Sequence, residues 1–170
     1  MENLPAIRLR SDVERKRLFG LGKLQESHSS FGENIYDNNT TMQTYGILKQ
    51  LSNNILKSGY NVIVDATFLS QAQRAQFFHL SVETDSKFII LDFIAPDEIL
   101  RERIKKRSKN IKEVSEADID VLENQLKSQE PLTHIELSFT YKIDTLQTFN
   151  FDAFQLYFNG NKKRFNPREI

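Results

Sequence analysis

The sequence contains no cysteine and no tryptophan, and it has only three histidines among its 170 residues. The lack of cysteine excludes disulfides and thiolate metal sites, and it leaves the redox compartment undetermined. The histidines, at positions 28, 79 and 134, have none of the spacings of a zinc site. His79 stands among aromatic residues in a helical pattern, which favours a structural role for it.

The chain also lacks a dominant charge and a long hydrophobic run. Lys plus Arg and Asp plus Glu number 23 each, so no net field steers the protein toward nucleic acid or a membrane. The longest apolar run, FIILDFIA, contains an aspartate and is too short to span a bilayer. The first residues, MENLPAIRLR, lack the basic and apolar regions of a signal peptide, so we expect a cytoplasmic protein.

Four short segments have the composition of β-strands. They are AIRLR at 6–10, NVIVDAT at 61–67, KFIILDFIA at 87–95 and ELSFTYKID at 136–144. The second and third are almost continuously β-branched or aromatic, which is typical of parallel strands that are covered on both faces. The fourth alternates between polar and apolar residues, which favours an edge strand.

Helical patterns fill the intervals between these strands. They cover 40–59, 69–85, 95–107, 115–129 and 150–160. Gly59 is placed as a C-terminal cap, Ser70 and Ser115 as N-caps, and Pro96 in a first turn. Alternating strands and helices predict an α/β fold, a three-layer sandwich around a mainly parallel sheet, and the length fits a single domain over 1–170.

Charged residues gather where the predicted strands end, which is where open parallel sheets bind their ligands. The candidates are Asp12, Arg15 and Lys16 after the first strand, Asp65, Thr67 and Arg74 at and after the second, and Arg103 and Arg107 in the helix after the third. Acids at strand ends with arginines on several elements suit phosphoryl transfer. One carboxylate can accept the proton of an attacking hydroxyl, a second can organise Mg²⁺, and arginines neutralise the moving phosphoryl group.

Each of these features has a structural interpretation as well. Asp12 could be the N-cap of the next helix, and the RERIKKR run could be a solvated helix face. Asp65 is the most informative, because an acid that ends an apolar parallel strand is seldom there for packing.

Three separated blocks together resemble one family. RLRSDVERKRLFGL, TYGILKQLSNNILKSGYNVIVDATFLSQAQRAQF and IAPDEILRERIKKRSKNIKEVSEADIDVLENQ are similar to the P-loop kinase module fused behind aminoglycoside-phosphotransferase-like domains in bacterial bifunctional proteins. The AAA-type kinase domains of phage polynucleotide kinase, zeta toxin and gluconate kinase are more distant likenesses. The resemblance runs from about Pro5 to Asp144.

The resemblance implies an ATP-dependent transferase and assigns roles to individual residues. Asp12 would orient or deprotonate the acceptor hydroxyl, and Arg15, with Lys16, Thr67 and Arg74, would hold the acceptor. Asp65 would lie at the Mg²⁺ site or near the substrate. Arg103 and Arg107 would belong to a lid over about 101–118 that closes on the nucleotide phosphates, and Arg107, like Asp12 and Arg15, would be catalytic.

One part of the family pattern is not found. These kinases place a strand, a G-x-x-x-x-G-K-[ST] loop and a helix before the RSD block, and the six glycines here form no such motif. The GLGKL stretch at 20–24 does not match the motif, because Lys23 is followed by leucine where the motif has serine or threonine. We therefore expect a truncated domain that contains the acceptor side and the lid but not the donor side. We also expect it to bind ATP no tighter than millimolar, which corresponds to a binding free energy of about 4 kcal/mol.

The family's sheet has the order 2-3-1-4-5, so the segment not found is its central strand. Its loss would leave 61–67 and 87–95 with facing unpaired edges. Closure of these two strands onto each other, or a homodimer or partner chain, is expected to complete the sheet, in preference to FQLYF of the C-terminal region. Three functions remain open: a half-site activated by a partner, a non-catalytic or degenerate kinase fold, and a nucleic-acid module, which the balanced charge disfavours. The substrate would be a small molecule or a nucleotide.

Overall fold

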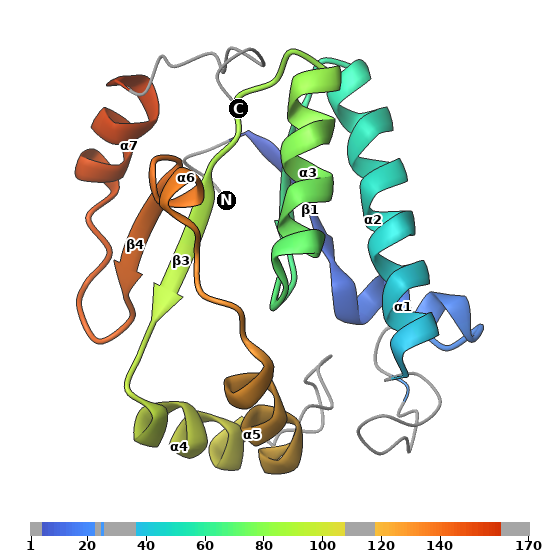
Figure 1. Ribbon diagram of the computed structural model, residues 1–170, viewed down its shortest axis with the longest axis vertical. Coiled ribbons are helices and arrows are strands. Elements are labelled where there is room, and N and C mark those ends of the chain that lie inside the picture. Colours follow the sequence, from blue (N-terminus) through green and yellow to red (C-terminus); the bar gives the residue numbers. More distant parts are fainter. Residues whose placement is uncertain (1–4, 23–24, 26–36, 108–117, 161–170) are drawn as a thin grey trace.

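The computed structural model describes residues 5–22, 25, 37–107 and 118–160. It contains four five-residue strands: β1 Ala6–Arg10, β2 Asn61–Asp65, β3 Ile90–Ile94 and β4 Thr140–Asp144. The helices are α1 Ser11–Leu18, α2 Asn38–Lys57, α3 Gln71–Glu83, α4 Asp97–Arg107, α5 Ile119–Ser128, α6 His134–Leu137 and α7 Phe151–Gly160. Strands and helices alternate along most of the chain (Figure 1), which confirms the predicted α/β class.

The strands form two parallel pairs. β1 pairs with β2 in the register Ile7↔Val62 to Arg10↔Asp65, and β3 pairs with β4 from Ile90↔Thr140 to Ile94↔Asp144. Among the described residues, β2 and β3 do not pair with each other. The expectation that these two strands close onto each other is therefore wrong for this structure. Figure 1 shows β3 and β4 on one side and β1 with α1, α2 and α3 on the other.

Local sequence signals account for the boundaries of the two longest helices. Asp37 caps α2 by accepting a hydrogen bond from the Thr40 amide at 2.5 Å. Gly59 follows this helix with a φ of +82°, a conformation that glycine adopts at little cost. Ser70 caps α3 in a reciprocal capping box with Gln73. The predictions for Gly59 and Ser70 are confirmed.

Other boundaries differ from those predicted. Pro96 precedes α4 and accepts its first hydrogen bonds through the carbonyl, instead of lying within the first turn. Asp118 caps α5, and Ser115 lies outside the described residues. The predicted strand 136–144 begins with the end of α6, because Thr133 and Glu136 form a second capping box there. FQLYF is part of α7, so it does not act as a strand.

The hydrophobic core extends on both sides of α3. On one side, Phe77 packs with Tyr45 and Leu48 of α2 and with partly buried residues of β1 and β2. On the other side, Phe78 contacts Phe88 and Phe139, which lie just before β3 and β4, at ring-centroid distances of 5.6 and 5.5 Å. Neighbouring phenylalanines of one helix therefore join the two strand pairs. No helix in the described part of the chain is both long and apolar enough to cross a membrane.

Candidate functional site

Asp12 and Arg15 lie in α1, which begins directly where β1 ends. The N-cap of α1 is Arg10, which makes no side-chain capping bond, and Asp12 occupies the first turn. The interpretation of Asp12 as an N-cap is therefore wrong. Its carboxylate lies 4.0 Å from the Arg10 guanidinium and its side chain is 30% exposed, so it is accessible to a ligand.

Arg15 connects α1 to the first turn of α2. Its Nη1 donates to Thr41 Oγ1 at 3.1 Å, and the side chain is largely buried. The carboxylate of Asp37 is close enough to respond to this charge. Hydrogen bonds from Thr40 lower the pKa of Asp37, and Arg15 lowers it further. The guanidinium is thus held in one place at the carboxyl end of β1.

Tyr45 of α2 brings the same region into contact with the end of β2. Its hydroxyl accepts a hydrogen bond from the Phe68 amide at 3.0 Å and a second from Thr67. Burial raises the pKa of Tyr45, and the charges of Asp12 and Arg15 act on it in opposite directions. The Tyr45 hydroxyl therefore bonds the turn that carries Thr67, and the charges of Asp12 and Arg15 act on it electrostatically.

Sequence reasoning placed Tyr45 only on the apolar face of a helix. The sequence did contain one signal, the hydroxyl of Tyr45 itself. A buried tyrosine usually has a hydrogen-bond partner, and tyrosine is the less common choice in this chain, which has 13 phenylalanines and 5 tyrosines. A tyrosine in the middle of an apolar stripe could have been predicted to reach a polar site.

The turn that carries Thr67 has an unusual backbone. Phe68 has a φ of +47°, a left-handed conformation that is uncommon for a bulky residue. Its ring packs edge-on against Tyr45 and Phe77, with centroids 5.3 and 5.1 Å away. Its amide bonds Tyr45 and its carbonyl accepts from Arg74 Nη1 at 3.1 Å. Backbone strain of this kind is often found at functional sites, and here the contacts of Phe68 hold the turn that carries Thr67.

Asp65 was predicted to bind Mg²⁺, and its surroundings do not fit that role. Its carboxylate accepts hydrogen bonds from Arg8 and lies 3.5 Å from Arg10 Nε, both on the neighbouring strand. Among the described residues, no group of three or more acidic or histidine side chains is arranged to hold a metal ion. Asp65 as described stabilises the β1–β2 pair by neutralising two arginines.

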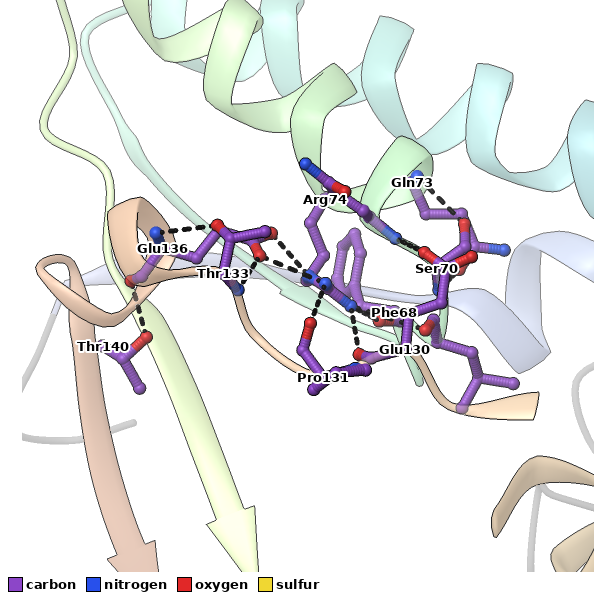
Figure 2. A network of polar contacts seen from close by, with 11 residues as sticks. Phe68, Ser70, Gln73, Arg74, Glu130, Pro131, Thr133, Glu136 and Thr140 are labelled. Atoms are coloured by element: carbon purple, nitrogen blue, oxygen red, sulfur yellow. Dashed lines mark hydrogen bonds and ion pairs between the residues drawn. The ribbon is translucent and has the colours of Figure 1, made fainter. Parts of the chain in front are cut away.

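Arg74 was predicted to hold the substrate, and its geometry argues against that role. The side chain is 5% exposed, and Nε donates to Glu136 Oε1 at 2.6 Å. Nη2 donates to Glu136 Oε2 and to the Pro131 carbonyl, at 3.1 and 3.2 Å. Nη1 donates to the carbonyls of Phe68, Leu69 and Glu130. Figure 2 shows this network, which uses all five guanidinium hydrogens and leaves none for a substrate.

The remaining candidates occupy different parts of the molecule. Lys16 is 2% exposed within α1. Arg103 of α4 donates to Thr145 Oγ1 at 2.6 Å and to the Thr145 carbonyl at 3.0 Å. Arg107 ends α4, and residues 108–117 of the predicted lid, like Lys23, lie outside the described residues. Of the predicted residues, Asp12 and Arg15 therefore share α1 at the end of β1, and Tyr45 of α2 bonds the turn that carries Thr67.

The described strand–helix junctions offer no cradle for a nucleotide phosphate. α1 follows β1 without a loop. At the start of α3, the amide of Gln71 donates to Glu130 and that of Gln73 to Ser70. Before α4 stands Pro96, which has no amide hydrogen. Phosphate loops require several free backbone amides, so these described junctions do not form one.

Parallel strands that lead into helices, with charged residues near their carboxyl ends, are consistent with a P-loop NTPase, kinase-like α/β fold. A family model described as AAA domain matches residues 1–132, and the chain belongs to this family. The family is one of nucleotide-binding domains with this α/β fold, so it supports nucleotide binding as the general function. No curated protein matches the sequence.

Proposed function

We propose that this chain provides the acceptor side of an ATP-dependent kinase, which transfers a phosphoryl group to a hydroxyl of a small molecule or nucleotide. The observation that carries the proposal is that two hydrogen bonds, Arg15 to Thr41 and the Phe68 amide to Tyr45, join the end of β1, the start of α2 and the turn after β2, with Asp12 in the first turn of the helix that carries Arg15. These side chains come from α1 and α2 and from the turn after β2, at the end of the strands where α/β proteins bind their ligands.

Asp12, Arg15 and Thr67 have different roles in the proposed phosphoryl transfer. The Asp12 carboxylate takes the proton of the acceptor hydroxyl as that oxygen bonds to the γ-phosphorus of ATP, while the bond from this phosphorus to the bridging oxygen breaks and ADP leaves. The Arg15 guanidinium, fixed by Thr41, binds an anionic group of the acceptor. Thr67 offers a hydroxyl for orientation.

Arg103 and Arg107 of α4 are the candidate cations for the nucleotide phosphates. Arg103 is bonded to Thr145, so it would have to leave this partner to reach a phosphate. No step is assigned to Mg²⁺, because the carboxylate expected to organise it is engaged by arginines. The donor side would come from a segment outside these 170 residues, and the chain by itself would be inactive.

A non-catalytic phosphate-binding domain is the second candidate. The observation that favours it is the structural use of two predicted site residues, Asp65 and Arg74. Both functions require binding at Arg15, and only the first requires a proton acceptor. Asp12→Asn separates them, because it would reduce phosphotransfer by a completed domain by about 10²–10⁴-fold and leave acceptor binding intact.

The experiment that tests the acceptor site is a titration of the isotopically labelled chain with mononucleotides and sugar phosphates, followed by NMR. We expect amide shifts around Arg15, Thr41 and Thr67, and a loss of at least tenfold in affinity with Arg15→Met. Arg17→Met is the matched control, since Arg17 is on the same helix but 66% exposed and paired with Glu14. Equal affinity in the two variants would contradict the proposed acceptor site.

A further inference from the structure

The connector between α5 and α6 is bonded to the turn that carries Thr67, and all three polar groups of Glu130 take part. Its amide donates to the Leu69 carbonyl at 2.8 Å, and its carboxylate accepts from the Gln71 amide at 2.5 Å. Its carbonyl accepts from Arg74 Nη1 at 3.2 Å. Figure 2 shows Glu130 beside this turn and the start of α3. An exposed residue from a distant part of the chain therefore holds the turn by its backbone and by its side chain.

The turn requires contacts of this kind, because its backbone is strained. Phe68 has a φ of +47°, and a bulky residue keeps such a conformation only where its surroundings fix it. Tyr45 holds the Phe68 amide from α2. Glu130 holds the next residue, Leu69, from the connector. The position of Thr67 therefore depends on a segment that sequence analysis did not connect with the site.

The carboxylate of Glu130 has a specific place at the start of α3. The Gln71 amide belongs to the first turn of this helix, where the amides have no partner within the helix. A negative charge at this end also interacts favourably with the helix dipole. The bond from Gln71 to Glu130 therefore fastens the connector to the helix that follows the acceptor turn.

The connector is also the end of the α4–α5 pair. α5 ends at Ser128, and its C-cap, Gln129, is extended with φ −67° and ψ 118°, so a single residue separates the helix from Glu130. α5 is joined to α4 by the ion pair of Arg101 and Glu123 at 2.7 Å. Figure 1 shows the two helices at the lower end of the molecule. A displacement of the pair would therefore reach Glu130 through one residue.

The contact of α4 with the end of β4 is of a kind that an anion can displace. Within the described residues 97–107, α4 has no buried side chain. The Arg103 guanidinium bonds the hydroxyl and the carbonyl of Thr145, and both of these acceptors are neutral. Hydrogen bonds to an anion are roughly twice as strong as those between neutral groups. An anionic ligand near α4 would therefore draw Arg103 away from Thr145.

We propose that Glu130 is a positioning residue of the acceptor site, through which the placement of α4 and α5 sets the conformation of the turn that carries Thr67. While Arg103 bonds Thr145, α5 holds Glu130 against Leu69 and the start of α3. When Arg103 leaves Thr145, this hold loosens and the turn opens more often. The inference rests on the proposed function, because it connects the candidate phosphate cations of α4 with the acceptor residues.

The test needs no ligand, because Arg103→Ala breaks the same contact with Thr145. The measurement is amide hydrogen exchange by NMR at Phe68, whose protection reports on opening of the turn. It is made on the unmodified chain, on Arg103→Ala, on Glu130→Ala and on the double variant, which together form a double-mutant cycle. We expect Arg103→Ala to accelerate exchange at Phe68 about threefold or more, and to have almost no further effect once the Glu130 carboxylate is removed.

Two control variants make this result specific. Lys106→Ala removes another exposed cation of α4, one that pairs with Glu102 of the same helix, and it should leave the exchange rate at Phe68 unchanged. Glu130→Gln keeps an oxygen that can accept from the Gln71 amide. The effect of Arg103→Ala should therefore persist in the Glu130→Gln background, which a role of the residue in general stability would not require.

Three results would overturn the proposal. They are an unchanged exchange rate in Arg103→Ala, an equal acceleration with and without the Glu130 carboxylate, and an equal acceleration by Lys106→Ala. A titration with mononucleotides, followed at the Arg15 amide, separates this inference from the proposed function. Coupling without a response at Arg15 would support the role of Glu130 and contradict the acceptor site. A response at Arg15 without coupling would contradict the role of Glu130 and support the acceptor site.

Discussion

Arg74 connects the two halves of the molecule at the scale of a single side chain. It is buried, and it bonds both carboxylate oxygens of Glu136 and four backbone carbonyls from segments more than fifty residues apart in sequence. We expect Arg74→Ala to lower the free energy of unfolding by about 3–5 kcal/mol, because it leaves a part-buried carboxylate and several carbonyls unpaired. Urea denaturation followed by circular dichroism measures the effect.

Arg103→Ala is the control for this substitution. Arg103 also bonds a side chain and a carbonyl, both of Thr145, but it is exposed. Its removal should change the free energy of unfolding by no more than about 0.5 kcal/mol. If Arg74→Ala were as mild as Arg103→Ala, the structural role assigned to the network of Figure 2 would be wrong.

Glu136 gives this network a pH dependence. Burial raises the pKa of Glu136, but hydrogen bonds from Arg74 and Thr133 outweigh it and bring the pKa below its usual value. A carboxyl whose folded-state pKa is depressed stabilises the fold above its unfolded pKa, about 4.3, and loses that effect as the pH falls through the folded value. The stability difference between the unmodified chain and Glu136→Gln should therefore be largest near pH 7 and shrink below about pH 4. Urea midpoints of both proteins at four pH values test this, and a constant difference would contradict it.

Tyr45 holds the strained turn after β2 through one hydrogen bond. Tyr45→Phe keeps the ring contacts with Phe68 and Phe77 but leaves the Phe68 amide without its acceptor. We expect a loss of about 1–3 kcal/mol in thermal unfolding experiments, and altered amide shifts at Thr67. Tyr60→Phe, at an exposed position, should have no effect on either measurement. An unchanged melting temperature in Tyr45→Phe would refute the role of this hydroxyl.

The positions of residues were predictable where they follow from the end of a strand. Asp12 and Arg15 come just after β1 and Thr67 comes just after β2, and their roles in binding or catalysis stay predictions. Arg74 forms a hydrogen-bonded ion pair with Glu136, 62 residues later in the sequence, and Asp65 forms one with Arg8, 57 residues earlier. No local pattern indicates such distant partners, which is why both residues were predicted to bind ligands.

α3 is the element on which the arrangement of the two strand pairs depends. Its start is fixed by the capping box of Ser70 and Gln73, in which each side chain bonds the other residue's amide. Ser70→Ala should destabilise the protein by about 1 kcal/mol in urea denaturation, since an amide of the first turn loses its acceptor. Ser58→Ala is the comparison, because the Ser58 hydroxyl is exposed and bonds only the Asn54 carbonyl. Equal stability of the two variants would argue against the capping box.

The strands were predictable as elements because their composition is extreme. AIRLR coincides with β1, and the apolar runs at 61–67 and 87–95 contain β2 and β3. The strand predicted over 136–144 is wrong in its first half. The capping box of Thr133 and Glu136 starts a short helix there, and β4 begins only after it. The pairing of strands was harder to predict, because it depends on how α3 packs with both halves and not on the composition of the strands alone.

At the scale of the whole molecule, the described residues form two parallel strand pairs joined by a bridging helix. The central proposal is that the chain by itself binds ATP no tighter than millimolar, because the described strand–helix junctions offer no phosphate cradle.

The most direct test of this claim is calorimetric titration of Mg·ATP into the purified chain, with light scattering on the same sample to define its oligomeric state. A second titration uses the chain joined at its N-terminus to the strand, G-x-x-x-x-G-K-[ST] loop and helix of a domain from the same family. We predict no binding by the chain alone up to several millimolar and micromolar binding by the completed domain. Micromolar binding by the monomeric chain alone would contradict the account.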